Sequence, residues 1–455
     1  MASSVTVALP TIGREFSMPP AALSWVVTSY FLAIAAFLIP FGKAGDLYGR
    51  RNLFLRGIAL YTASSFGAGC APEATPLIAF RVLQGIGGSM IFSSGVAMLT
   101  SAVAPGERGK MLGLNVAATY IGLSLGPPIG GMLTQTMGWR SIFFVNVPLG
   151  LVMAAFVLWK IRRDKPAGGP AGPPAGPREG FDFGGSAVYT VSLAALMLGL
   201  SYCPRAGGIA LSAAGVSGLA IFIWMESRAA APVLTIGLFR RNRVFVFSNL
   251  AALASYSATT GAVFLISLYL QYVKGLSPKD AGLIMLAQPL VMALLSPFAG
   301  KLSDRIEPRM VASAGMALTA ASLFCFSRMT EASHLFPVVA GLVLFGAGIA
   351  FFSSPNTSAI MGAADKTQYG AASSIVGTMR LAGSILSMSI AAMILSSHLG
   401  NAPVTPARHP LFIAGVKESF VVFAVLCALG VLCSCARGRV RGKGAALAGQ
   451  EILID

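Results

Sequence analysis

One arginine, Arg81, draws attention because it lies inside a long run of apolar residues. It begins the pattern R-x-x-Q-G, whose spacing places Arg81, Gln84 and Gly85 on one face of a helix. A charged side chain at membrane depth is costly and normally faces a polar cavity or a partner. The pattern therefore predicts a functional charge. The alternative is an arginine near the end of its helix that extends its charge to the membrane surface.

A second arginine, Arg380, lies about eleven residues into another apolar run, too deep to reach the membrane surface easily. On a helix it shares a face of small and polar residues with Ser373, Gly377 and Ser384. We predict that Arg380 contributes to a binding cavity.

A charged loop occurs twice in the chain. GKAGDLYGRR (42–51) and GKLSDRIEPR (300–309) share Gly, Lys, Asp and the final Arg. Glycines permit a tight turn between helices, and Asp46 is placed to cap a helix and to pair with nearby guanidinium groups. Such repeats are typical of transporters built from two related halves. The alternative is a basic loop that only sets the topology.

The segment GLSLGPPIGG (122–131) combines small residues with prolines. Gly122, Gly126 and Gly130 recur every four residues, so they predict a smooth helix face for close backbone contact. Pro127 and Pro128 should interrupt the helical hydrogen bonds and bend the helix.

Residues for enzyme chemistry are not grouped in this sequence. It has no phosphate-binding G-x-x-x-x-G-K-[ST] loop, its three histidines form no H-E-x-x-H pattern, and its six cysteines have no metal-ligand spacing. None of the 16 acidic residues lies deep in an apolar run. The sequence therefore predicts neither an enzyme nor a cofactor or metal site.

Composition places these motifs in a membrane. Of 455 residues, 55% are hydrophobic and 11% are charged, and the mean hydropathy is +0.75. A soluble domain carries about 25% charged residues, so the chain lacks the polar surface that a soluble protein needs. The net charge of +17 is scattered between apolar runs rather than gathered on one face, which argues against nucleic-acid binding. We predict a multi-pass protein embedded in the lipid bilayer.

Thirteen apolar runs are long enough to cross a bilayer as helices, which takes about 20 residues. They cover residues 22–41, 53–71, 77–102, 111–135, 141–160, 183–203, 208–226, 244–272, 281–300, 310–328, 335–358, 370–396 and 416–436. If loop 42–52 is cytoplasmic, basic residues on the inner side outnumber those on the outer side by about three to one. This bias supports the assignment of the spans.

The runs and the linker between them divide the chain into units. We predict an N-terminal helix bundle (1–160), a cytoplasmic Pro/Gly linker (161–182), two extra transmembrane helices (183–226), a C-terminal six-helix bundle (244–436) and a cytoplasmic tail (437–455).

Together the motifs resemble the major facilitator superfamily. Loop 42–51 is similar to its cytoplasmic loop signature, R-x-x-Q-G to its fourth-helix motif, and G-x-x-x-G-P-x-x-G-G to the fifth-helix signature of its antiporters. Residues 24–33, 138–150, 267–278 and 370–384 resemble its fourteen-helix drug:proton antiporter branch. The resemblance implies an all-α fold of two six-helix bundles with two extra helices between them.

The resemblance also implies roles for individual residues. The cytoplasmic gate would consist of Gly42, Asp46, Gly49, Arg50, Arg51, Asp304 and Arg309; proton coupling would involve Arg81, Gln84 and Gly85; and the antiporter motif would comprise Gly122, Gly126, Pro127, Gly130 and Gly131. Substrate would bind near the membrane midplane between the halves. Candidates for that cavity are Trp25, Tyr30, Asn115, Tyr120, Tyr256, Gln288, Asn356 and Arg380.

The implied function is proton-coupled efflux of small hydrophobic compounds or drugs by alternating access. We expect a monomer in the plasma membrane that uses a proton gradient and no cofactor. Buried arginines without a buried acid favour a neutral or anionic substrate over a cation. The alternative is an exporter of a metabolite such as an amino acid or a sugar.

The first helix departs from the family pattern. VALPTIG (7–13) resembles the end of its first spanning helix, yet only nine residues precede Pro10, and Met1 stands about where the family often has an acidic residue. Ten helical residues reach about 15 Å, half of the hydrocarbon thickness. We therefore expect the natural protein to begin about ten to thirty residues upstream, with a polar partner for Arg81 in that extension.

The charge bias predicts that the linker and the tail are both cytoplasmic. Reporter enzymes fused at Gly169 and at Lys443 should therefore show cytoplasmic activity. External activity at both positions would invert the topology.

The resemblance also implies that Asp46 holds the cytoplasmic side closed. Asp46→Asn should strongly reduce transport in membrane vesicles, because it removes the charge that pairs with arginine. Membrane insertion, followed by the amount of protein in the membrane, should not change. Full transport by this variant would leave the loop with a topological role only.

Overall fold

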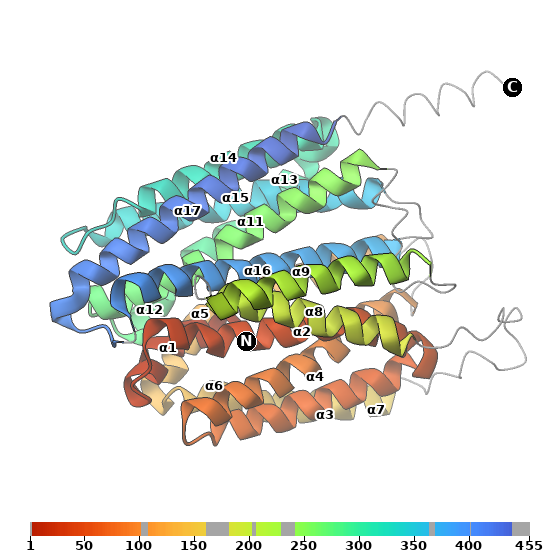
Figure 1. Cartoon of the computed structure of the whole chain (residues 1–455), viewed down its shortest axis with the longest axis horizontal. Helices are drawn as coiled ribbons and strands as arrows, with labels where there is room; N and C mark the ends of the chain where they lie inside the picture. Colours follow the sequence, from red (N-terminus) through yellow and green to blue (C-terminus); the bar gives the residue numbers. More distant parts are fainter. Residues whose placement is uncertain are drawn as a thin grey trace, which may run out of the picture.

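The computed structural model describes residues 2–101, 108–160, 182–202, 206–228, 242–363, 369–400 and 402–438. Within these ranges the regular elements are all helices. The helices lie side by side along the longest axis of the molecule (Figure 1). We call the end with the turns at Phe16–Pro19 and Met137–Arg140 the outer end, following the charge prediction.

The N-terminal half consists of six rods. They are α1 (Ala2–Glu15), α2 (Pro20–Tyr48), α3 (Arg50–Gly69), α4 (Ala74–Ser101), α5 (Arg108–Met137) and a sixth rod formed by α6 (Arg140–Phe144) and α7 (Asn146–Lys160). Between α2 and α3, Gly49 has a φ of 94°, a conformation that costs glycine little but strains other residues. This glycine allows the chain to reverse within a single residue.

The C-terminal half repeats this arrangement. Its rods are α11 (Arg243–Leu268) with the π-helical segment η2 (Tyr269–Val273), α12 (Pro278–Met285) with α13 (Ala287–Arg305), α14 (Pro308–Phe326), α15 (Leu335–Gly362), α16 (Tyr369–Leu399) and α17 (His409–Ala436), which follows the short 3-10 helix η4 (Pro406–Arg408). In Figure 1 this half, coloured green to blue, lies above the red to yellow N-terminal half.

Two further helices, α8 (Phe183–Tyr202) and α9 (Ala206–Glu226), lie over the boundary between the halves (Figure 1). The Tyr189 hydroxyl of α8 donates a hydrogen bond to the Ala35 carbonyl of α2 (3.2 Å), and the Thr190 hydroxyl donates one to Ala36 (2.9 Å). Tyr189 also belongs to a buried apolar cluster that includes Ile385 of α16. The inserted pair therefore covers the seam where α2 meets α16.

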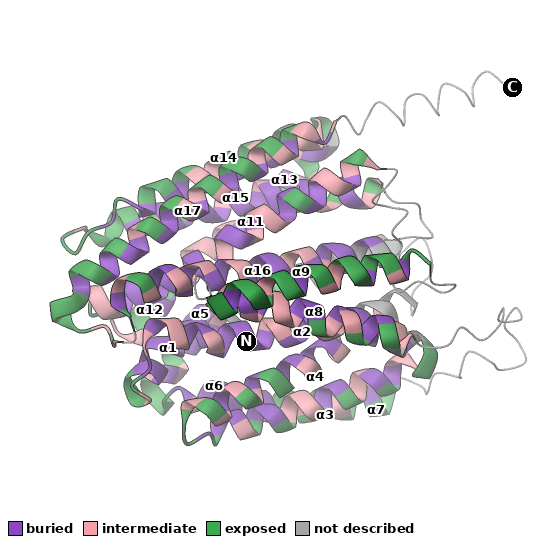
Figure 2. Cartoon of the chain, in the orientation of Figure 1, coloured by how far each residue is buried: buried purple, intermediate pink, exposed green. Residues whose placement is uncertain are grey.

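Burial follows the geometry of a helix bundle in lipid. Side chains between the helices are buried, and faces turned outward are exposed (Figure 2). Large apolar side chains remain exposed on the outward faces, including Leu294, Phe298 and Leu432. Among the described residues, ten helical segments are long and apolar enough to cross a membrane, whereas α1 has only 14 residues.

Most predicted spans agree with the helices within a few residues. The predicted loops 42–51 and 300–309 are largely helical instead, because α2 continues to Tyr48 and α13 to Arg305. The last helix begins at His409 rather than at residue 416, so Glu418 lies within it. Helix α5 continues through Pro127 and Pro128 to Met137. Arg437, which the sequence places in the tail, caps α17 and is fully buried. Residues 161–181 of the linker and 439–455 of the tail lie outside the described residues.

Candidate functional site

Arg81 lies on α4 at the centre of a polar network inside the N-terminal half, and it is 1% exposed. Its Nε donates a hydrogen bond to the Val26 carbonyl of α2 (2.8 Å), and its Nη1 donates one to Gln84. Gln84 in turn donates to the Ser65 hydroxyl of α3 (2.6 Å). The arginine is therefore fixed between three helices and does not extend to the membrane surface.

Tyr30 and Gly85, both beside Arg81, make different contributions to the site. The guanidinium lies 4.2 Å from the centre of the Tyr30 ring, an attractive contact for a desolvated cation. A Cβ at Gly85 would lie 2.7 Å from the Ala33 Cβ, so only glycine lets α4 approach α2 this closely. The Nη2 atom of Arg81 is buried and has no hydrogen-bond partner in the described part of the chain.

The glycine–proline segment of α5 lies where the two halves meet, between the middle of the bundle and its outer end. Gly126 and Gly130 face α1: a Cβ at Gly130 would lie 2.7 Å from Ser4 Cα, and one at Gly126 would collide with Ser3. Gly131 faces the other half, where a Cβ would lie 3.0 Å from the Pro278 carbonyl carbon of α12. These glycines bring three backbones into contact across the seam.

Two other members of this segment behave differently. A Cβ at Gly122 would meet nothing within 4 Å, so this glycine, expected on the contact face, lies outside it. The carbonyl of Pro127 contacts Gly282 of α12. Proline has no N–H, so the two prolines remove two helical hydrogen bonds without ending α5.

Main-chain carbonyls of α1 close the same seam from the other side. Ser267 donates a hydrogen bond to the Thr6 carbonyl (3.0 Å), and Gln271 donates one to Val7 (2.8 Å). Pro10 has no N–H to offer the Thr6 carbonyl, and the Ser267 hydroxyl supplies a hydrogen bond in its place. Gln271 lies in the π-helical η2, so the outer contact is made by an irregular turn of the C-terminal half.

The last turn of α1 binds both halves. Arg14 donates to the Gln271 carbonyl (3.3 Å) in the C-terminal half. Glu15 pairs with Arg140 (2.6 Å) and accepts a hydrogen bond from the Trp139 indole (2.7 Å) in the N-terminal half. Burial alone would raise the pKa of the Glu15 carboxyl, but the bonds from Trp139 and Arg140 hold it below its usual range. This end of α1 stays charged at neutral pH.

A second polar cluster surrounds Arg380 of α16. Its Nη2 donates to the Thr357 hydroxyl of α15 (2.9 Å), and its guanidinium lies 5.5 Å from the centre of the Tyr256 ring of α11. The Tyr256 hydroxyl lies 3.4 Å from that of Ser353. Arg380 and Tyr256 were identified as candidates from the sequence. Thr357 and Ser353 were missed, because their roles arise from contacts that α15 makes with other helices.

Two other cavity candidates contact side chains of neighbouring helices or chain segments. Trp25 packs beside Tyr202 of the inserted α8, with ring centres 6.1 Å apart. Asn356 is buried, donates to the Ser248 carbonyl (3.0 Å) and accepts a hydrogen bond from Arg437 (3.0 Å). These two residues therefore hold helices together.

Of the remaining candidates, Gln288 packs its main-chain carbonyl against Gly346 of α15. Asn115 and Tyr120 lie on α5, and their side chains are outside the described part.

Burial lowers the pKa of Arg437, which follows the last span, to about 10, so it remains charged at neutral pH.

The predicted cytoplasmic gate is only partly described. Arg51 is buried and donates to the Leu158 carbonyl of α7 (3.4 Å), a contact within the N-terminal half. Arg309 lies in the first turn of α14, and a Cβ at Gly42 would meet nothing within 4 Å. The side chains of Asp46 and Asp304 are outside the described part, so the latch, to which Arg50 also belongs, stays a prediction.

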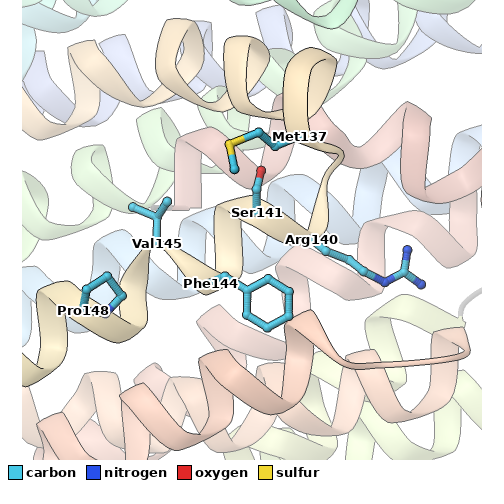
Figure 3. Close-up of a pocket in the computed structure, with 6 residues that line it drawn as sticks. All are labelled: Met137, Arg140, Ser141, Phe144, Val145 and Pro148. Atoms are coloured by element: carbon cyan, nitrogen blue, oxygen red, sulfur yellow. The ribbon is translucent and has the colours of Figure 1, made fainter.

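A hollow of about 470 Å³ opens on the outer corner of the N-terminal half (Figure 3). It is lined by Met137, Arg140, Ser141, Phe144, Val145 and Pro148. All six belong to α5–α7 or the turns between them, and the Arg140 side chain is engaged by Glu15. This hollow is therefore not the space between the halves in which substrate is expected.

Comparison with known proteins places the chain among membrane transporters. The sequence model of the Major Facilitator Superfamily matches residues 1–281 and 249–451. The chain is 29% identical over 433 residues to the riboflavin transporter RibZ of Clostridioides difficile. The alignment covers 94% of this chain and 92% of that protein. It is 31% identical over 443 residues to the cephamycin export protein CmcT of Amycolatopsis lactamdurans, covering 94% and 88%.

The fold also matches a solved transporter. A bacterial homolog of the human lysosomal transporter Spinster, crystallised in an inward-facing and unoccupied conformation, superposes with a TM-score of 0.70. The match covers 96% of this chain and 93% of that one at 16% identity, so it supports the fold alone.

The outer seam predicts unequal effects of one substitution at two glycines of α5. Gly131→Leu should push α5 away from α12, because its side chain would meet backbone that cannot move aside. A cysteine reporter at Ser4, in a background without native cysteines, should then react several-fold faster with a membrane-impermeant maleimide.

Gly122→Leu is the matched control for this experiment. It adds the same side chain to the same helix, where a Cβ meets nothing within 4 Å. The reporter should react as in the parent protein. Equal labelling of the two variants would show that Gly131 does not hold the seam closed.

Proposed function

We propose that this chain, which belongs to the major facilitator superfamily, exports small organic compounds, drugs among them, from the cytoplasm in exchange for protons. It would act by alternating access, as a monomer in the plasma membrane, with no cofactor. The proposal makes it a transporter rather than an enzyme.

The observation that carries the proposal is the contact of α5 with α1 near the middle of the bundle and with α12 toward the outer end. Gly130 and Gly131 bring main chains together with no side chain between them, and Gly126 makes room for the Ser3 side chain. A contact of this kind can separate and reform without rotamer changes, as an outer gate must do in each cycle. With the outer seam closed, substrate can reach the cavity only from the cytoplasmic side, a state that an exporter passes through in every cycle.

Similarity to known proteins supports the same direction of transport. One relative is, by its name, an export protein for an antibiotic. The resemblance of the α5 segment to the antiporter signature adds proton exchange to the proposal.

Arg81 is the candidate for coupling transport to protons. Its buried Nη2 has no partner among the described residues, although its other donors are bound. An arginine does not lose its own proton at physiological pH. It would therefore act by stabilising the charged form of a group that gains and loses a proton during the cycle.

A second candidate function is the export of a single metabolite. It is favoured by the similarity to a riboflavin transporter over 94% of the chain. Under this alternative the fold and the gate are the same, and the range of substrates is narrow.

The proposal predicts substrate accumulation in everted membrane vesicles that contain the protein. Vesicles with an acidic lumen should accumulate antibiotics and fluorescent drugs, because protons leaving the lumen would drive substrate in. A protonophore should abolish the accumulation, and vesicles without the protein are the control.

Three results would change the proposal. Accumulation that survives the protonophore would reject proton exchange. Accumulation of riboflavin but of no drug would favour the metabolite exporter. Vesicles that accumulate none of these compounds would contradict export of either class.

A further inference from the structure

Arg380 occupies an unusual position among the charged residues of the chain. It lies eleven residues after Tyr369, the first residue of α16, which is about 16 Å along the helix. The described ion pairs, Glu15–Arg140, His398–Glu418 and His409–Glu331, involve residues toward the outer end. Arg380 has no acidic partner in the described part of the chain. Its charge is therefore held inside the membrane by neutral groups.

The surroundings of Arg380 differ from those of a purely structural arginine. Arg437, in the same half, is fully buried and donates to Asn356 and to the Ser248 hydroxyl. Arg380, Thr357 and Tyr256 are only half-buried. A side chain that is half-exposed within a bundle is accessible to a ligand, whereas that of Arg437 is not.

The face of α16 that carries Arg380 is turned toward the junction of the two halves. One helical turn before it, Gly377 is close to α2, because a Cβ there would lie 3.6 Å from the Leu38 side chain. One turn after it, Gly383 packs against α11, where a Cβ would lie 2.7 Å from the Tyr256 Cβ. Arg380 therefore lies between α11 and the seam with α2.

The donors of the guanidinium are only partly used. Nη2 is bound to Thr357, whereas Nε is buried without a partner among the described residues. An unsatisfied donor on a charged group is costly in a medium of low dielectric constant. An anionic oxygen bound to the half-exposed end of the guanidinium would neutralise this poorly compensated charge.

We propose that Arg380, positioned by Thr357 and Tyr256, binds the acidic group of the exported compound, and that the preferred substrates are organic acids with a carboxylate. The inference rests on the proposed export function for its biological meaning. Its chemistry can be tested by binding alone. The cationic drugs that many exporters carry would be repelled at this position.

The test uses three probes that share one ring system: naphthalene-2-carboxylate, naphthalene-2-carboxamide and naphthalen-2-ylmethylammonium. Their equilibrium binding is measured on the purified full chain in detergent. The carboxylate should bind about tenfold more tightly than the amide, the gain expected from one charge-assisted hydrogen bond. The ammonium probe should bind most weakly.

Two arginine variants separate the site from general effects on the fold. Arg380→Gln should lower the affinity for the carboxylate about tenfold and leave that for the amide unchanged. Arg437→Gln removes a buried arginine of the same half whose hydrogen bonds go to Asn356 and to the Ser248 hydroxyl rather than to Thr357. It should destabilise the protein without changing the ratio of carboxylate to amide affinity.

Each outcome of the test has a definite meaning. Tightest binding of the ammonium probe to the unmodified protein would overturn the inference even if Arg380→Gln fails to fold. So would an unchanged carboxylate to amide ratio in a folded Arg380→Gln protein. Selective carboxylate binding without vesicle accumulation would count against export and leave the site intact. Export confined to cations would leave export standing and reject the site.

Discussion

The close approach of α5 to α1 and α12 is the contact on which the closed outer end depends. Helices in lipid gain little from burying apolar side chains against one another, so close backbone packing has to supply much of the attraction. Glycine is the only residue that fits between α5 and these two neighbours. The same contact joins the N-terminal half to the C-terminal half, so the residues that pack the bundle also determine which side is closed.

Charge inside the bundle imposes a second constraint. Arg81 is enclosed by a carbonyl, an amide side chain and an aromatic ring, all of them neutral. Arg380 is held by a hydroxyl and a ring. Each arrangement retains a positive charge at membrane depth and leaves one donor without a partner in the described residues. The interior is thus suited to negative charge, whether on a substrate or on a group that releases a proton.

Helix positions and local faces follow from the sequence, whereas contacts between helices do not. The i, i+3 and i+4 spacing placed Arg81, Gln84 and Gly85 on one face, as the structure confirms. Gly122 lies outside the contact face on which it was expected. The contacts of Trp25 with Tyr202 and of Asn356 with Arg437 were not predicted. A helix that is apolar all round gives no signal of which side meets lipid and which meets protein. The last helix begins at His409, seven residues before the predicted span, because Pro410 lies in its first turn, where proline is tolerated.

The hydrogen bonds that join α1 to α11 and η2 have a consequence for the proposed coupling of transport to a proton gradient. Their donors are the hydroxyl of Ser267 and the amide of Gln271, and their acceptors are main-chain carbonyls. None of these groups titrates in the physiological range. The strength of this contact is therefore the same on the acidic and on the alkaline side of an energised membrane. A proton gradient cannot act on it directly, so any work taken from the gradient has to reach the outer gate mechanically, through the tilt of the helices.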